Sequence, residues 1–386
     1  MLDSNLEPND GWLQRVVDFR RFLHARPCLS GYEADTVAMI RQFLGAAPPH
    51  QEVTLAGGTG IAFVYKGNRP GKRLLLRADT DALPIQEINT FHYRSKVERV
   101  SHTCGHDGHT AMLAGIAPQL VSGNFSGEVV LLFQPAEEIG KGAAAIIRDP
   151  AFDMISPDFV AGLHNLPGYP LGSVCLREGA FAAASEGITI RLTGKTAHAA
   201  YPDHGLSPAM AVAQLLTGLE GIKNPVSDPD EFHLVTVVYA QLGSLAFGTA
   251  PGEAEIAATL RTFSNQGIDS LKSRLSVLAH EVAARHDLGS SVAFSESFRA
   301  TFSDASMVKA ASLAAEAAGR QVIWLPDPFR WSEDFGQFSE RWPGVFAGMG
   351  SGLNQSPLHQ ADYDFPDDLI PFGIAYWEQL VRQILT

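Results

Sequence analysis

The chain has 386 residues, 45% of them hydrophobic, so it is long enough for two domains with apolar cores and is not intrinsically disordered. Its formal net charge of −13 argues against nucleic acid as a partner, because phosphate binding requires clustered lysine and arginine. The three cysteines, Cys28, Cys104 and Cys175, are odd in number and far apart, which excludes a disulfide framework and fits a reducing compartment.

The N-terminal segment, residues 1–14, is acidic and lacks an apolar core, so we expect no secretory signal peptide. No window reaches the roughly 18 uninterrupted apolar residues that a membrane-spanning helix needs. We therefore expect a cytoplasmic protein with neither nucleic acid nor a membrane as its partner.

The first part of the chain predicts helices followed by strands. Helical spacing of apolar residues over 11–46 predicts two helices separated by a Pro/Gly-containing break. Strands are predicted at Gly60–Tyr65 and Arg73–Arg77, and the second runs into Asp79 and Asp81. Acids just past a strand end lie where open α/β sheets bind ligands, although an Asp pair in a loop also commonly forms turns.

The densest group of potential metal ligands is the window Ser101–Thr110. Its three histidines and one cysteine offer nitrogen and sulfur, and Asp107 offers oxygen. Its two glycines allow the backbone to turn tightly and approach an ion. Because the apolar run Ala111–Ile116 has helical spacing, we expect a ligand-bearing loop that leads into a buried helix. Since Cys104 has no second cysteine nearby, an open catalytic site is favoured over a closed structural zinc site.

Two further predicted strands end beside acids or a histidine. Gly127–Gln134 is almost continuously apolar, as is typical of a strand buried on both faces, and Glu137 and Glu138 follow it. Because side chains alternate along an extended backbone, one acid would bind a metal while the other faces a bound water. The alternative is a solvated acidic pair that opens the next helix. The strand Phe159–Leu163 then ends at His164.

The composition changes over 185–294, where the sequence has no further ligand cluster. Its patterns run strand, helix, strand, strand, helix, strand, which predicts a small α+β domain resembling a ferredoxin-like split βαβ. His198 has no neighbouring ligand there and is not expected, from the sequence alone, to bind a metal. The predicted elements are Ile188–Leu192, Pro208–Leu219, Phe232–Leu242, Glu253–Phe263, Leu271–His286 and Ser291–Phe294.

The α/β character returns in the last part of the chain. Ala305–Ala318 is predicted to be an alanine-rich helix, Val345–Met349 a strand, and a helix containing Trp377 closes the chain. The segment Ser332–Gly336 is typical of a helix N-terminus with acids in its first turn.

These patterns predict an α/β fold with one domain inserted into another. The sequence contains no repeat, low-complexity tract or Gly/Ser linker. We therefore expect 1–184 and 295–386 to form one split metal-binding domain, and 185–294 to form a smaller inserted domain.

Three stretches, Leu76–Pro84, Cys104–His109 and Gln134–Glu138, resemble the metal-dependent aminoacylase/carboxypeptidase family. Within it, the chain is similar to the amidohydrolases that include hippurate hydrolase, auxin-conjugate hydrolases and N-acetyl-diaminopimelate deacetylase. Further matches follow in the family's order and extend over nearly the whole chain: Leu163–Asn165, Gly194–Pro202, Ala258–Phe263, Ser332–Phe335 and Leu358–His359.

The resemblance implies a mixed-sheet, exopeptidase-like catalytic domain with two divalent metal ions. Glu137 would be the catalytic acid and base. A thiolate, a carboxylate and imidazoles suit zinc, and also manganese, nickel or cobalt. The implied ligands are Cys104, His106, Glu138, His164 and His359.

The resemblance also implies that the inserted domain serves as a lid and joins two copies into a homodimer. His198 would then reach the partner's active site and polarise the scissile carbonyl, and Arg261 matches a position that contacts the substrate carboxylate. Asp79 and Asp81 stand where more distant relatives carry an H-x-D metal motif. We expect Asp81 and Asp107 to hold metal ligands in place.

The expected activity is hydrolysis of the amide bond of a small N-acyl amino acid by a metal-activated water, with Glu137 as general base. A dipeptidase or carboxypeptidase, or a catalytically silent metal-binding homologue, are the alternatives. Gly248 stands where relatives often carry an Asn that binds substrate, so the preferred substrate is open.

Overall fold

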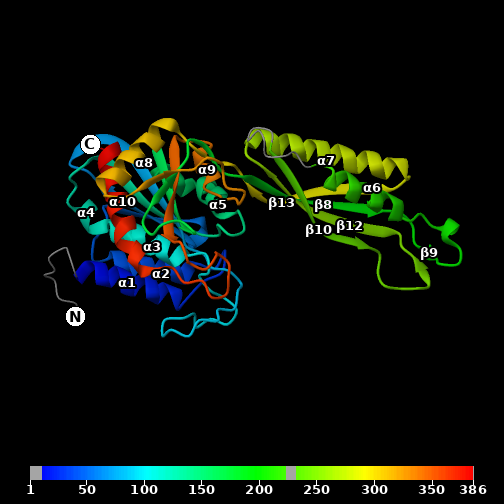
Figure 1. Cartoon of the computed structure of the whole chain (residues 1–386), viewed down its shortest axis with the longest axis horizontal. Coiled ribbons are helices and arrows are strands. Elements are labelled where there is room, and N and C mark those ends of the chain that lie inside the picture. Colours follow the sequence, from blue (N-terminus) through cyan, green and yellow to red (C-terminus); the bar gives the residue numbers. More distant parts are fainter. Residues whose placement is uncertain (1–10, 223–231, 386) are drawn as a thin grey trace. The chain divides into compact units, whose positions relative to one another are not determined.

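The structure is a computed structural model that describes residues 11–222 and 232–385. Within these ranges the chain divides into two compact units, each with its own hydrophobic core (Figure 1). The first unit comprises 11–181, 301–326 and 334–385, and the second comprises 182–222, 232–300 and 327–333.

The first unit is built on an eight-stranded mixed sheet. Its strands are β1 Gln51–Leu55, β2 Gly60–Lys66, β3 Arg69–Asp79, β4 Ser126–Gln134, β5 Phe159–Pro167, β6 Val174–Leu176, β15 Val322–Trp324 and β16 Gly344–Gly352. They lie in the order β1-β2-β4-β3-β5-β16-β6-β15. Because β4, β3, β5 and β16 are successive parallel neighbours, their carboxyl ends meet at one edge of the sheet.

Helices cover both faces of this sheet. They are α1 Gly11–His24, α2 Ala34–Leu44, α3 His106–Gly115, α4 Ala117–Val121, α5 Gly142–Arg148, α8 Ala305–Ala317, α9 Gly336–Ser339 and α10 Ile370–Ile384, with 3₁₀ turns at Ala56–Gly58, Pro150–Met154 and Asp367–Leu369. Residues of α1, α2, α3, α8 and α10 share one core with alternate strand residues such as Val345. Phe346 points to the opposite face, where its ring lies 5.1 Å from that of Phe335, just before α9. β4 is buried continuously from Val129 to Gln134, which confirms the prediction of a strand buried on both faces.

The second unit is a four-stranded antiparallel sheet with two helices packed into its core. Its elements are β8 Ala184–Thr193, β9 Ala197–His198, α6 Ala209–Glu220, β10 His233–Leu242, β11 Thr249–Ala250, β12 Glu253–Thr262, α7 Asn265–Arg285 and β13 Gly289–Phe298, with a 3₁₀ turn at Pro202–His204. The main strands lie in the order β10-β12-β8-β13, and β9 pairs with β11. The connection β8-α6-β10-β12-α7-β13 is that of a ferredoxin-like split sheet. A further small sheet joins β7 Gly179–Ala182 to β14 Thr301–Ser303.

Two predicted helix starts are wrong. α3 begins at His106 because Gly105, at a φ of +93°, forms its N-cap, so His106 and Asp107 lie in a helix rather than in a loop. α9 begins at Gly336, and Asp334 precedes it, because the Asp334 carboxylate accepts hydrogen bonds from Arg77 (2.8 Å) and from the backbone N–H of Ala143 (2.8 Å).

Three other predicted elements are too short. α7 begins at Asn265 rather than Leu271, because the hydroxyl of Ser264 accepts the N–H of Gly267 at 3.0 Å and so caps the helix. β5 continues to Pro167 through its pairing with β16, so His164 lies within a strand and not after one. β13 extends over Gly289–Phe298 because it pairs with β8.

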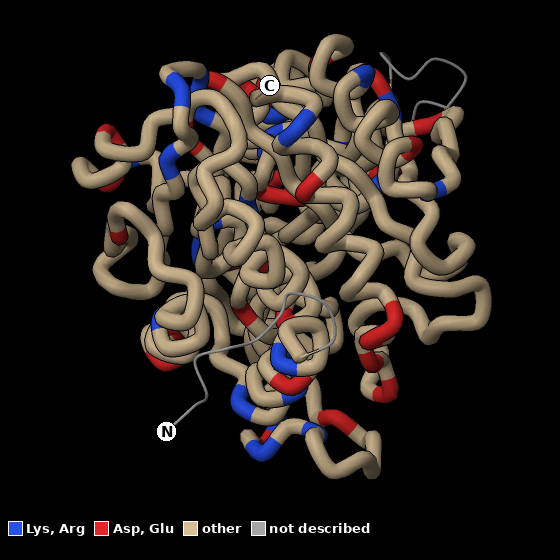
Figure 2. The backbone as a smooth tube through the Cα atoms, turned by 90° about the vertical axis from the view of Figure 1, so that its left-hand side faces the viewer, with Lys and Arg blue, Asp and Glu red and all other residues tan. Residues whose placement is uncertain are grey.

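Charged residues of both signs are distributed along the chain. In the backbone view of Figure 2, positions of lysine and arginine are interspersed with positions of aspartate and glutamate. Among the described helices, none is both long enough and apolar enough to cross a membrane.

Candidate metal centre

The five predicted ligands converge at the edge of the sheet where the parallel strands end. Cys104 lies in the turn just before α3, His106 at the first position of α3, Glu138 in the loop after β4, His164 in β5, and His359 in the loop after β16. Cys104 Sγ lies 3.6 Å from His164 Nε2. The carboxylate oxygens of Glu138 lie 3.7 Å from His106 Nε2 and 3.7 Å from His359 Nε2. The structure therefore brings together residues from four separate parts of the chain.

These side chains fit a cation. Metal bonds of about 2.0–2.3 Å place the atoms that share one ion roughly 3.3–3.8 Å apart, as these atoms are. His106 Nε2 and Glu138 Oε1 are buried, and neither has a hydrogen-bond partner in the described part of the chain. Leaving such atoms unpaired costs about 1–3 kcal/mol each, a cost that ion binding would remove. The thiol, carboxylate and imidazole set suits zinc, manganese, nickel or cobalt.

Burial sets the protonation of these groups. Burial and then Glu138 raise the pKa of Cys104 well above its ordinary value. Burial, and then Asp81 against the attraction of His106, raises the pKa of Glu138 to about 7. Burial and then neighbouring histidines lower the pKa of His164 and of His359, which keeps both imidazoles neutral and able to bind a metal. A metal entering this site must displace protons, so its affinity rises with pH.

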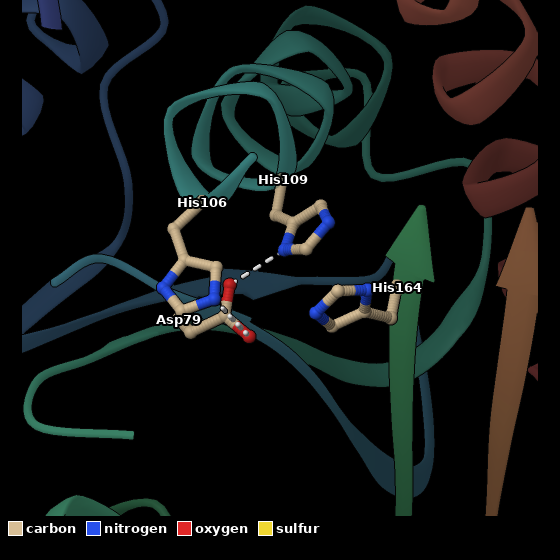
Figure 3. A group of neighbouring side chains, drawn as sticks. All are labelled: Asp79, His106, His109 and His164. Atoms are coloured by element: carbon tan, nitrogen blue, oxygen red, sulfur yellow. Dashed lines mark hydrogen bonds and ion pairs between the residues drawn. The ribbon is translucent and has the colours of Figure 1, made fainter. Parts of the chain in front are cut away.

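Asp79 and His109 support the predicted ligands through hydrogen bonds. Figure 3 shows His106 and His109 projecting from α3 toward Asp79, with His164 on β5 beside them. His109 Nδ1 donates to Asp79 Oδ1 at 2.6 Å, and His109 Nε2 accepts the backbone N–H of Asn165 at 3.0 Å. His164 Nδ1 donates to the carbonyl of Asn165 at 2.8 Å, which leaves its Nε2 for an ion.

Asp79, His106, His109 and His164 together offer ligand atoms within 4.8 Å of one another. Both nitrogens of His109 are already bonded, however, so we assign it to orientation rather than to metal binding. Sequence reasoning did not single out His109. The available signal was its position on the same face of α3 as His106, three residues away.

Asp81 contacts one predicted ligand and the backbone of another. Its carboxylate Oδ1 lies 3.3 Å from His106 Nδ1, and its backbone carbonyl accepts from the same nitrogen at 2.9 Å. Its Oδ2 accepts the backbone N–H of Glu138 at 3.0 Å and the hydroxyl of Ser30 at 2.6 Å. These bonds support the expectation that Asp81 holds ligands in place.

Asp107 is bonded to α1. Its Oδ2 forms an ion pair with Arg20, whose Nε lies 2.9 Å away, and accepts from His24 Nδ1 at 2.8 Å, and His24 Nε2 lies 3.2 Å from Glu87 Oε1. All four side chains are buried. Asp107 therefore links the start of α3 to α1. It affects the neighbouring His106 by fixing the position of α3.

The loop that carries Glu137 has an unusual backbone. Glu137 is buried, and its carboxylate lies with His106 and Glu138 in a group whose ligand atoms are within 4.8 Å of one another. The preceding residue, Ala136, has a φ of +51°, and His359 has a φ of +65°. Such values disfavour residues with a Cβ and occur where surrounding bonds impose them. Here the N–H of His359 donates to the carbonyl of Thr103 at 2.8 Å.

Three sequence-predicted positions lie in the second unit. His198 is exposed on β9, and its Nδ1 accepts the N–H of Ala200 at 3.0 Å. Arg261 on β12 is half-buried and donates to the Ser332 hydroxyl at 2.8 Å. A Cβ built on Gly248 meets no atom within 4 Å. The catalytic and substrate-binding roles of these positions stay predictions.

The mixed α/β sheet and its Cys/His/Glu cluster define a protein with a candidate two-metal centre. Residues 75–383 match the family model described as Peptidase family M20/M25/M40, and the chain belongs to this family.

Named relatives and a solved structure extend this similarity. The chain is 35% identical over 350 residues to N-acetyl-L-cysteine deacetylase of Bacillus subtilis (strain 168), covering 90% of this chain and 83% of that protein. It is 32% identical over 370 residues to hippurate hydrolase of Campylobacter jejuni, covering 95% of each. A Bacillus subtilis structure described as a dinuclear metal-binding peptidase of the M20 family superposes with a TM-score of 0.84 at 28% identity, covering 97% of this chain and 98% of that one. The resemblance and the mixed α/β fold predicted from the sequence are thus confirmed.

Proposed function

We propose that the protein is a metal-dependent amidohydrolase that cleaves the amide bond of small N-acyl amino acids. The observation that carries this proposal is the convergence of five metal-binding side chains beside the buried carboxylate of Glu137. Relatives named for N-acetylcysteine and for hippurate, both N-acyl amino acids, support the substrate class. The assay described below determines which acyl group and which amino acid the protein accepts.

Each side chain has a separate task in this mechanism. Two divalent ions bound at the site would lower the pKa of water and polarise the scissile carbonyl. Cys104, His106, Glu138, His164 and His359 would hold them. The carboxylate of Glu137 accepts the proton of the attacking water and then returns it to the leaving nitrogen, acting as general base and then general acid.

The second unit supplies substrate contacts in this proposal. The guanidinium of Arg261 binds the substrate carboxylate, for which its fork of donors is suited. The imidazole of His198, supplied by a second copy in a homodimer joined through this unit, polarises the carbonyl. We further propose a cytoplasmic location, because a thiol ligand such as Cys104 survives best in a reducing compartment.

The test is an assay of chelated protein restored with single metals, using N-acetyl and N-benzoyl amino acids and dipeptides. We expect release of free amino acid that depends on the metal. Glu137→Gln should keep the metals and lose about 10²–10⁴-fold in kcat, because the amide cannot accept the proton. Metal content by atomic absorption is the control. Full activity of the chelated protein or of Glu137→Gln would contradict the proposal.

A further inference from the structure

The loop that carries Glu137 is held by carboxylates on both of its sides. The N–H of Ala136, just before Glu137, donates to Oε1 of Glu33 at 2.9 Å. The N–H of Glu138, just after it, donates to Oδ2 of Asp81 at 3.0 Å. The peptide units that flank the general base are therefore fixed by two acids from distant parts of the chain.

The segment before α2 contributes to both of these bonds. Glu33 belongs to it, and the hydroxyl of Ser30 donates to the same Asp81 oxygen at 2.6 Å. Glu33 also accepts the N–H of Gly31 at 2.8 Å, which fixes its carboxylate within the segment. The segment 30–33 thus acts as one unit on the loop after β4.

Helix capping does not explain the burial of Glu33. Its relative exposure is 0%, and its Oε2 has no hydrogen-bond partner in the described part of the chain. It stands at the N-cap of α2, but its side chain makes no capping hydrogen bond to that helix. Burying a carboxylate is costly. The bond to Ala136 is the contact that reaches outside its own segment.

That bond stabilises a backbone conformation that alanine does not prefer. Ala136 lies at a φ of +51°, where a residue with a Cβ is disfavoured by about 1–2 kcal/mol. The carbonyl of Ala136 is bonded in turn by the N–H groups of Lys141 (3.2 Å) and Gly142 (3.0 Å). Without Glu33, the N–H of Ala136 loses this hydrogen-bond acceptor. A relaxed φ at Ala136 would then change the orientation of the next residue, Glu137.

We propose that Glu33 is a positioning residue that, together with Asp81, fixes the peptide units around Glu137 and so orients the general base. This inference rests on the proposed function in one respect, the role of Glu137 as base. Glu33 does not touch the reacting atoms. Its loss therefore lowers kcat and leaves metal content and KM nearly unchanged.

The kinetic test compares Glu33→Leu with Glu33→Gln in metal-loaded enzyme. Leucine removes the acceptor and should lower kcat about 10–100-fold, the scale of a misplaced catalytic group. Glutamine keeps an oxygen acceptor and should restore most of kcat. Thr36→Val is the matched control, because Thr36 is buried on the same helix and its hydroxyl has no hydrogen-bond partner among the described residues. Equal losses in Glu33→Gln and Glu33→Leu would overturn the proposal.

A double variant separates positioning from general destabilisation. If Glu33 acts through Glu137, Glu33→Leu in the Glu137→Gln background causes no further loss of kcat. If the double variant instead loses kcat by the product of the two single-variant factors, Glu33 acts elsewhere. Ser30→Ala gives a milder variant that keeps the buried carboxylate, and it should lower kcat without loss of metal.

A crystal structure of Glu33→Leu tests the inference without any activity. We expect Ala136 to leave the left-handed region and the carboxylate of Glu137 to move. An unchanged Ala136 and Glu137 would overturn the positioning role even in an active enzyme. Wild type that cleaves no member of the substrate panel would instead overturn the proposed function, while this structural comparison still decides the role of Glu33.

Discussion

At the scale of single residues, the orientation of His164 depends on a side chain that has no free nitrogen for a metal. His109 bonds Asp79 on one side and the N–H of Asn165 on the other, and the carbonyl of Asn165 fixes His164. Removing a hydrogen bond that orients a metal ligand typically weakens metal binding about 10–100-fold, and we expect a loss of this size here.

His109→Gln therefore should lower the affinity for one of the two ions by about 10–100-fold and leave the other nearly unchanged. Competition with a chromophoric chelator measures both constants. The matched control is His92→Gln, the same change at an exposed histidine. Undiminished affinity at both positions in His109→Gln would show that His164 is oriented by other contacts.

The side chains that converge at the candidate metal centre could be predicted from the sequence, as could the supporting contacts of Asp81, whereas those of Glu33 and His109 could not. Glu138 and His164 lie at or near the ends of apolar strands, and parallel strands bring such positions to one edge. Glu33 and His109 act through hydrogen bonds to residues far away in the sequence. The spacing of His109 and His106 places them on one face of a helix, but no sequence pattern shows which partners such side chains bond, because that depends on how the elements pack.

At the scale of elements, α3 is one of two helices in the first unit whose starts the sequence misplaced. Its ligand-bearing window looked like a loop because it holds two glycines. Gly105 does adopt a positive φ and caps the helix. Gly108 lies within the helix, and a Cβ there would meet the ring of Phe365 at 2.3 Å. Glycine is therefore needed at this position for close packing against Phe365 and not for a turn. Sequence alone does not distinguish these two uses.

The bond between α1 and α3 makes stability depend on pH. Burial disfavours a charged His24, but the Asp107 carboxylate and hydrogen bonds to Asp107 and Glu87 outweigh it and raise its pKa from 6.5 to about 9. The folded state therefore binds a proton that the unfolded state releases between these values. This contribution, about 3 kcal/mol, is fully present below pH 6.5 and is lost as the pH rises through about 9.

His24→Asn should remove this dependence. Between pH 6.5 and 9 the free energy of unfolding of wild type should fall by about 3 kcal/mol more than that of the variant. Urea denaturation of the metal-free proteins at several pH values measures the difference, and His92→Asn is the exposed control that should follow wild type. Parallel pH profiles of wild type and His24→Asn would mean that His24 is not charged in the fold.

At the scale of the whole molecule, the predicted site residues are divided between two units. The predicted metal ligands lie in the first unit, while His198, Arg261 and Gly248 lie in the second. Composition and element pattern predicted an inserted domain at 185–294, and they did not mark the short segment 327–333 of the second unit, to which Arg261 is bonded through Ser332. Seven residues are too few to form a pattern of their own.

Gly248 offers a test of how the second unit sets substrate preference. The family resemblance predicts that a substrate-binding Asn would replace this glycine in relatives, and a Cβ at Gly248 would meet no atom within 4 Å. Gly248→Asn should therefore leave the Tm unchanged. If the second unit binds substrate as proposed, the added amide lowers KM for the preferred N-acyl amino acid about 2–10-fold, the value of one hydrogen bond, at unchanged kcat.

Steady-state kinetics over the acyl panel measure this change, with the exposed Ala246→Asn in the same loop as the matched control. A gain that is specific to Gly248→Asn would place the loop at the substrate in the working enzyme. A KM that moves equally in both variants, or in neither, would mean that this loop does not contact substrate. Any preference among acyl groups would then have to arise from the first unit, around Glu137 and the predicted metal ligands.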